Sequence, residues 1–229
     1  MPDIRIISRS SQPFTDRTEA GRLLGEALVD VKLKRPLVLG IPRGGLITAL
    51  EIAKVVAGEL DIMISRKLRA PFNPELAMGA ITESGRVFLD ENLVGALGVT
   101  SEYLEQEKSF QMKEIQRRLK LVRTVLPRIP FDGREVVVTD DGVATGSTMR
   151  SALWVARQEH PARLVCALPV APARTADELA KFCDSLVLLR MPDNFYAVGQ
   201  FYTRFDQVED DQVLDILRHE AERRRLEVR

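Results

Sequence analysis

Several features that mark other protein classes are scarce in this chain of 229 residues. It contains only two cysteines, Cys166 and Cys183, and their wide separation excludes a disulfide framework or a cysteine-based zinc site. Its two histidines, His160 and His219, have no second ligand at metal-binding spacing, so no metal site built by the protein alone is expected. No apolar run approaches membrane-spanning length, and the first residues lack the apolar core of a signal peptide. We therefore expect a cytoplasmic protein without a membrane partner.

Net charge is also missing. Lys plus Arg and Asp plus Glu each number 33, which argues against nucleic acid as a partner held by bulk positive charge. The basic run Arg223-Arg224-Arg225 lies among glutamates and is interpreted as a solvated helix end rather than a polyanion patch. The chain also has no Walker A loop, no Gly-x-Gly-x-x-Gly and no Gly-x-Ser-x-Gly. These absences exclude P-loop, dinucleotide-binding and Ser-His hydrolase sites.

Short apolar segments that alternate with amphipathic ones are what the chain does contain. Strands are predicted at residues 37–41, 61–65, 135–139, 163–170 and 185–189, and helices at 15–31, 46–56, 147–158 and 175–182. This alternation predicts the α/β class, with a doubly wound parallel sheet. In such sheets ligands bind beyond the carboxyl ends of the strands.

The alternation stops between residues 66 and 130. Residues 70–74, Ala-Pro-Phe-Asn-Pro, are predicted to be an irregular loop, because their two prolines remove hydrogen-bond donors and restrict their neighbours. Residues 77–81 and 86–89 predict a hairpin, and residues 101–125 a long charged helix capped by Thr100 or Ser101. We therefore expect one domain over residues 1–229 that carries an insertion at 66–130.

The run from Val136 to Thr148 is the most informative stretch. A short apolar strand delivers the carboxylates Asp140 and Asp141, and a loop of small, hydroxyl-bearing and glycine residues follows before a helix. Such a loop points backbone N–H groups at an anion, and the helix dipole favours negative charge there. The carboxylates suit sugar hydroxyls better than phosphate. A ribose with a phosphate at one end satisfies both halves, whereas the simpler alternative is an Asp-Gly turn before a capped helix.

Two further cationic segments follow predicted strands. Pro42-Arg43-Gly44-Gly45 exposes backbone N–H groups and offers a guanidinium for phosphate oxygens, although it could also be a plain turn. Arg66-Lys67 precedes the proline-rich segment, which fits a loop that closes over a ligand. The alternative for this pair is an ordinary solvated site.

These motifs together resemble those of the type I phosphoribosyltransferases, enzymes of nucleotide metabolism that use phosphoribosyl diphosphate (PRPP). The resemblance spans nearly the full length and includes Asp-Asp-Gly-x-Ala-Thr-Gly and Phe-Tyr-Ala-Val-Gly. It implies catalytic roles for Asp140, Asp141 and Lys67. It implies that the 5-phosphate is held by Val143, Ala144, Thr145, Gly146, Ser147 and Thr148. It implies that the pyrophosphate is held by Arg43, Gly44, Gly45 and Arg66, with a strained or cis peptide in that loop.

Residues 190–205 resemble the base-binding hood of hypoxanthine-type members. Phe195 would stack on a planar base, with Tyr196 and, from outside this segment, Arg174 as further base contacts. An extra residue separates Phe195 from Val-Gly, and the acidic residue of those enzymes falls on Tyr202, so recognition of exocyclic groups does not carry over. The alternative is that these aromatic residues belong to a satellite core.

The resemblance implies transfer of a phosphoribosyl group from PRPP to a nitrogenous, base-like acceptor with release of pyrophosphate. Mg²⁺ is the implied cofactor, carried mainly by PRPP itself, with Asp140 and Asp141 as its only candidate protein contacts. A homodimer is a further expectation. The alternative function is a regulator that binds PRPP or a nucleotide without turnover.

Overall fold

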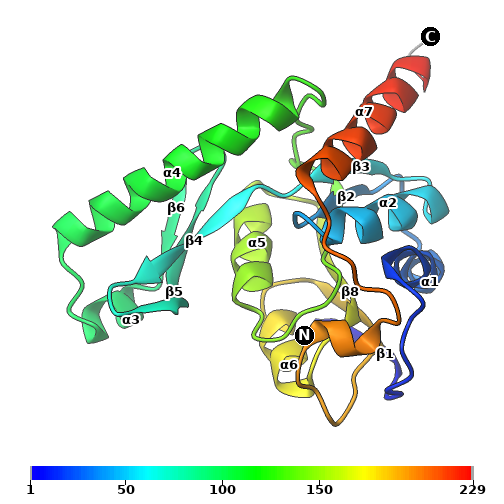
Figure 1. Ribbon diagram of the computed structural model, residues 1–229, viewed down its shortest axis with the longest axis horizontal. Coiled ribbons are helices and arrows are strands. Elements are labelled where there is room, and N and C mark those ends of the chain that lie inside the picture. The colour runs from blue at the N-terminus through cyan, green and yellow to red at the C-terminus, as the bar shows by residue number, and fades with distance from the viewer. Residues whose placement is uncertain (1, 228–229) are drawn as a thin grey trace.

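A six-stranded sheet forms the centre of the computed structural model, which describes residues 2–227, with residues 75 and 227 as backbone alone (Figure 1). The strand order is β1-β9-β8-β7-β2-β3, and every pairing is parallel. The strands are β1 (Asp3–Ser8), β2 (Leu37–Gly40), β3 (Glu59–Ile62), β7 (Glu135–Thr139), β8 (Arg163–Val170) and β9 (Ser185–Arg190). The predicted doubly wound parallel sheet is confirmed, and β1 is an additional strand that the sequence did not predict.

Helices cover both faces of this sheet because its strands are apolar on both sides. Val137 and neighbouring inward residues pack on one face with α1 (Arg17–Val29), α2 (Gly45–Val55) and α7 (Asp210–Glu227). Val136 and Val138 point to the other face, against α5 (Ser147–Arg157) and α6 (Ala173–Ala180). The alternation of side chains along β7 therefore supplies two separate cores. Both cysteines are free and buried among these apolar side chains.

A second, antiparallel sheet occupies much of the insertion, at the left of Figure 1. It consists of β4 (Ser65–Ala70), β5 (Asn73–Thr82) and β6 (Val87–Leu89), followed by α3 (Glu91–Ala96) and α4 (Ser101–Arg123). The hairpin of β5 and β6 and the long helix are confirmed, and Thr100 caps α4 by accepting a hydrogen bond from the Tyr103 N–H. Helix α3 was not predicted.

The prediction of an irregular loop at residues 70–74 is wrong. Pro71 and Phe72 form the turn of a hairpin in which Ala70 pairs with Asn73, and Pro74 lies within β5. Its missing N–H is tolerated because the β4–β5 register shifts on both sides of Arg69, where a bulge leaves residues without a ladder partner. The predicted strand at residues 61–65 is likewise divided between β3 and β4.

Buried ion pairs attach the C-terminal end of α4 to the central sheet. Arg123 donates to Asp61 on β3 at 2.7 Å and to Glu83 at 3.0 Å, and the Asp61 side chain is fully buried. The Ile129 N–H donates to the second oxygen of Asp61. This end of the insertion is therefore fixed to the core.

Helix α7 covers the outer edge of β3. Glu220 accepts a hydrogen bond from the Leu60 N–H at 3.2 Å, Arg224 donates to the Leu60 carbonyl, and Arg223 donates to the Gly58 carbonyl. The basic run interpreted as a solvated helix end thus has two members that satisfy backbone groups of an edge strand. Among the described helices, none is long and apolar enough to cross a bilayer.

Candidate active site

Two loops meet at the carboxyl edge of the sheet because β2 and β7 are neighbours. Gly40 pairs with Thr139, so the segment 41–45 and the acidic pair leave the sheet side by side. A Cβ at Gly44 would lie 2.0 Å from Asp141 Oδ2, and one at Gly45 would lie 2.8 Å from the Cα of Asp140. Only glycine permits this approach. The peptide between Pro42 and Arg43 is cis, as the resemblance implied.

The acidic pair is largely withdrawn from solvent. Asp141 accepts a hydrogen bond from Arg17 Nε at 2.7 Å, and these two side chains are 15% and 11% exposed. Burial raises the pKa of Asp140, and the neighbouring Asp141 raises it further. Burial also raises the pKa of Asp141, whereas Arg17 opposes the rise. A cation, or a hydroxyl that donates a hydrogen bond, would therefore stabilise the ionised form of this pair.

The segment 142–148 has the geometry of an anion cradle. Gly146 adopts a left-handed conformation (φ 77°) and directly precedes α5, whose first-turn N–H groups have no partner within the helix. Ala144, Thr145 and Thr148 are exposed, and the Thr175 hydroxyl fixes the loop by donating to the Ala144 carbonyl at 2.7 Å. The loop therefore presents N–H and hydroxyl donors to solvent.

A cavity of ≈ 390 Å³ joins these elements to the insertion. It is lined by Pro42 of the first loop, by Thr148 of the cradle, and by Arg66 and Lys67 of β4. Arg66, Thr148 and Lys67, one residue from each of the groups assigned to pyrophosphate, 5-phosphate and catalysis, thus share one cavity, whereas Asp140 and Asp141 are not among the described residues that line it. Arg66 donates to Gln111 Oε1 at 3.1 Å and lies 3.7 Å from Glu114, so α4 holds it in place.

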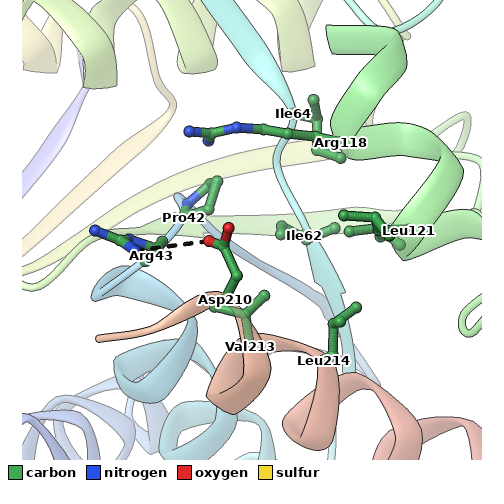
Figure 2. Close-up of a pocket in the computed structure, with 10 residues that line it drawn as sticks. Pro42, Arg43, Ile62, Ile64, Arg118, Leu121, Asp210, Val213 and Leu214 are labelled. Atoms are coloured by element: carbon green, nitrogen blue, oxygen red, sulfur yellow. Dashed lines mark ion pairs between the residues drawn. The ribbon is translucent and has the colours of Figure 1, made fainter. Parts of the chain in front are cut away.

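Other predicted site residues lie away from this cavity. Arg43 points toward Asp210 at the start of α7, at 3.7 Å (Figure 2), and lies 3.5 Å from Glu209, the residue before that helix. Phe195 packs on Phe201 with ring centroids 5.1 Å apart, while Tyr196 is 88% exposed. Arg174 is 92% exposed and pairs with Glu178 one turn along α6. The role of Arg43 toward pyrophosphate, and those of Phe195, Tyr196 and Arg174 toward a base, stay predictions.

Two residues around the acidic pair were not assigned to the site from sequence. Arg17 holds Asp141 and also donates to the Asp206 carbonyl at 2.8 Å. Tyr202 donates its hydroxyl to the Asp141 carbonyl, and burial raises the pKa of this phenol. No local motif marks Arg17, since its partners are distant in sequence.

Carboxylates are the side chains near the cradle that best suit a hard cation. In the described part of the chain, no group of three or more His, Cys, Asp or Glu side chains could hold a metal ion. Asp140 and Asp141 therefore fit Mg²⁺ only as additional ligands to an ion that a phosphate-bearing substrate brings.

Comparison with known proteins places this geometry in a family. The phosphoribosyl transferase domain model matches residues 17–206. Two Mycobacterium tuberculosis proteins, named "Putative phosphoribosyl transferase MT0597" and "Putative phosphoribosyl transferase Rv0571c", are each 40% identical over 204 residues, 89% of this chain. The chain spans 46% of the length of each of these relatives.

A solved structure agrees over a longer share. The crystal structure of TT1426 from Thermus thermophilus is 42% identical, covers 91% of this chain and 99% of that chain, and superposes with a TM-score of 0.86. A ribose-phosphate pyrophosphokinase from Sulfurisphaera tokodaii is 31% identical over 112 residues, 49% of this chain and 34% of that protein. Because the domain model covers most of the chain and the fold agrees with it, the chain belongs to the phosphoribosyltransferase family.

Proposed function

We propose that the protein transfers a phosphoribosyl group from PRPP to a nitrogenous acceptor and releases pyrophosphate. The observation that carries the proposal is the shared cavity, which joins Thr148 of the cradle, Pro42 of the glycine loop and Lys67 of β4. A ligand with phosphates at both ends of a ribose fits such a cavity. The acidic pair lies against Gly44 and Gly45 of the glycine loop and does not itself line the cavity, so the ribose would have to reach it from the edge of the cavity beside Pro42.

The chemistry follows from these positions. The bond from C1 of the ribose to the pyrophosphate oxygen breaks, and its electron pair leaves with pyrophosphate. The acceptor nitrogen forms the new bond to C1 and releases its proton to solvent. Asp140 and Asp141 hold the ribose hydroxyls and stabilise the positive charge that develops at C1. Lys67, Arg66 and the backbone of Gly44 and Gly45 stabilise the departing negative charge.

Mg²⁺ has a supporting role in this proposal. When bound to PRPP, it would neutralise part of the pyrophosphate charge, and the carboxylates of Asp140 and Asp141 are the protein groups that would contact it. The part of the reaction that falls to the chain itself is to orient the ribose between the acidic pair and the cradle.

The acceptor is proposed only as a planar, nitrogen-containing base. Phe195 would stack on it, which is worth about 1 kcal/mol beyond burial. Tyr196 is exposed beside Phe195 and would contact the base from solvent. Arg174 would have to leave Glu178 to reach a base carbonyl.

A regulator that binds PRPP or a nucleotide without turnover is the second candidate. The same acidic pair and cradle serve both functions, because both require the same ligand. Pyrophosphate release measured with a panel of bases separates them. Release with at least one base supports transfer, whereas tight PRPP binding without release on any base supports the regulator.

PRPP calorimetry tests the site itself. Replacing both carboxylates, Asp140→Asn with Asp141→Asn, should weaken PRPP binding by about tenfold or more, since two charge-assisted hydrogen bonds are lost. Asp193→Asn, at a residue whose side chain is 84% exposed, is the matched control. Unchanged PRPP affinity in the double variant would show that the ribose assignment is wrong.

A further inference from the structure

The insertion contributes one wall of the cavity that we assign to PRPP. Gln111 and Arg118 of α4 line it, opposite Thr148 and beside the β4 residues Arg66 and Lys67. Arg69 of β4 also lines it, and no acidic side chain is among the described residues that do so. The cavity wall is therefore cationic on the side of the insertion.

These cations differ in how far acidic neighbours neutralise them. Arg69 is paired with Glu107, with N–O distances of 2.9 and 3.3 Å. Arg66 lies 3.7 Å from Glu114. Arg118 has no acidic partner among the residues that the structure describes. No described ion pair therefore neutralises its charge at the cavity.

Arg66 and Arg118 also oppose one another. Burial lowers the pKa of Arg66, and the positive charge of Arg118 is the next largest cause of that decrease. When two guanidinium groups repel one another across a cavity, a polyanion bound between them lowers their electrostatic energy. Together with the cationic lining of Arg66, Lys67, Arg69 and Arg118, this repulsion favours an anionic ligand in the cavity.

Arg118 is directed at the loop assigned to pyrophosphate. Figure 2 shows its side chain extending from α4 above Pro42, and both residues line this cavity and a smaller, more apolar one. Its backbone is held firmly, because Val122, one turn later, is buried and Arg123 is bonded to Asp61 at 2.7 Å. A side chain on a fixed helix binds without the cost of ordering its backbone, although its own rotamer freedom is still lost.

We propose that Arg118 binds the pyrophosphate group of PRPP, so that the inserted helix α4 supplies a cation of the site from within the chain. This inference rests on the proposed function. It assigns to the insertion a part in substrate binding, in which α4 acts as a fixed wall instead of a loop that closes.

Calorimetry with three probes tests the assignment: PRPP, inorganic pyrophosphate and ribose 5-phosphate. Arg118→Gln should weaken the binding of PRPP and of pyrophosphate by about tenfold, the effect of one charge-assisted contact. Ribose 5-phosphate, which lacks the pyrophosphate group, should bind with unchanged affinity. The matched control is Arg117→Gln, one residue earlier on α4, whose side chain is 67% exposed and faces Glu114.

Arg118→Lys keeps the charge and should recover part of the lost pyrophosphate affinity. Equal losses for ribose 5-phosphate and pyrophosphate, or no loss for pyrophosphate, would overturn the inference. The two proposals fail differently. A wild-type protein that binds neither PRPP nor pyrophosphate refutes the proposed function, whereas PRPP binding that needs Asp140 and Asp141 but not Arg118 refutes only this inference.

Discussion

Arg17 holds Asp141 across 124 positions of sequence, with Nε and Oδ2 2.7 Å apart. The same guanidinium lies 3.9 Å from the ring centroid of Phe205 and donates to the Asp206 carbonyl. The first turn of α1 and the segment where the hood ends, at Phe205 and Asp206, therefore both fix one carboxylate of the acidic pair. The orientation of Asp141 is set before any substrate arrives.

Replacing this cation should alter how PRPP binding depends on pH. Arg17 opposes the rise in the pKa of Asp141, so Arg17→Gln should raise that pKa and favour the protonated carboxyl. PRPP binding should weaken, and its pH profile should move to higher pH. We expect stability to fall by about 1–3 kcal/mol, because a buried charge loses its partner or takes up a proton.

PRPP calorimetry over a pH series, together with urea unfolding, measures both effects. Arg22→Gln on the same helix is the control, since Arg22 is 51% exposed and pairs with Glu26 on the helix surface. A pH profile identical to that of the wild type would show that Arg17 does not set the ionisation of Asp141.

Asp140 should make the fold less stable as pH rises. Burial raises its pKa, so the folded state keeps a proton that the unfolded state releases near the ordinary value of 3.8. Below the pKa of the unfolded state, Asp140 makes its full contribution to the free energy of unfolding. This contribution is lost as the pH rises through the pKa of the folded state. Asp140→Asn removes the ionisation, and it should stabilise the protein by about 1 kcal/mol or more above that window.

Urea unfolding of wild type and Asp140→Asn at several pH values tests this. The difference in the free energy of unfolding should grow with pH and then level off. Parallel curves would contradict the prediction. The expected gain in stability comes with the loss of PRPP affinity described above, as is common where a functional site is built at the expense of stability.

Gly44 should tolerate no side chain. A Cβ there would lie 2.0 Å from Asp141 Oδ2 and 2.8 Å from Arg17 Nε, so Gly44→Ala must separate the two loops or break the ion pair. We expect a loss of about 1–3 kcal/mol in stability and weaker PRPP binding.

Gly95→Ala is the contrasting substitution, measured by thermal unfolding and by PRPP calorimetry. Gly95 lies in α3, and a Cβ there would have no neighbour within 4 Å. Alanine favours the helix, so stability should rise by about 0.5–1 kcal/mol while PRPP affinity stays constant. A Gly44→Ala variant that binds PRPP like the wild type would show that the contact between the loops is dispensable.

The buried pair of Asp61 and Arg123 should anchor α4. Asp61→Ala leaves the guanidinium and the Ile129 N–H without their acceptor, which should cost about 3–5 kcal/mol. Hydrogen exchange should then increase in α4 more than in β7. Asp215→Ala is the control, because Asp215 is 61% exposed and its partner Arg218 is 57% exposed. Uniform exchange across both elements would argue against a local anchor.

Local sequence sufficed where an element is buried on both sides. The predicted limits of β7 and β8 are those observed, because their apolar runs lie between polar turns. β1 was missed since its side chains are mostly exposed, and its stability comes from pairing with β9 near the other end of the chain. Pro74 misled the prediction because the β4–β5 bulge that accommodates it has no sequence signal.

The residues of the candidate site likewise fall into those that local sequence indicates and those that only the packing of distant elements brings together. Asp140, Asp141 and the cradle are contiguous in sequence, so their chemistry could be predicted from the order of residue types. Arg17 and Arg118 reach the site only through packing of α1 and α4, and nothing beside them in sequence distinguishes them from other surface arginines. All these roles stay predictions, and those of the hood have the least structural support, because neither Phe195 nor Tyr196 lines the described cavity.

Coverage of β3 by α7 bears on how copies of this chain can polymerise. Glu220 and Arg224 occupy the N–H and carbonyl groups of Leu60, which closes that end of the sheet to another strand. At the opposite end β1 has β9 as its one neighbour among the described strands, so strand addition there would join two sheets edge to edge and stop at a pair. If α7 detached, both ends would be open, and the same sheet would become a unit of indefinite growth.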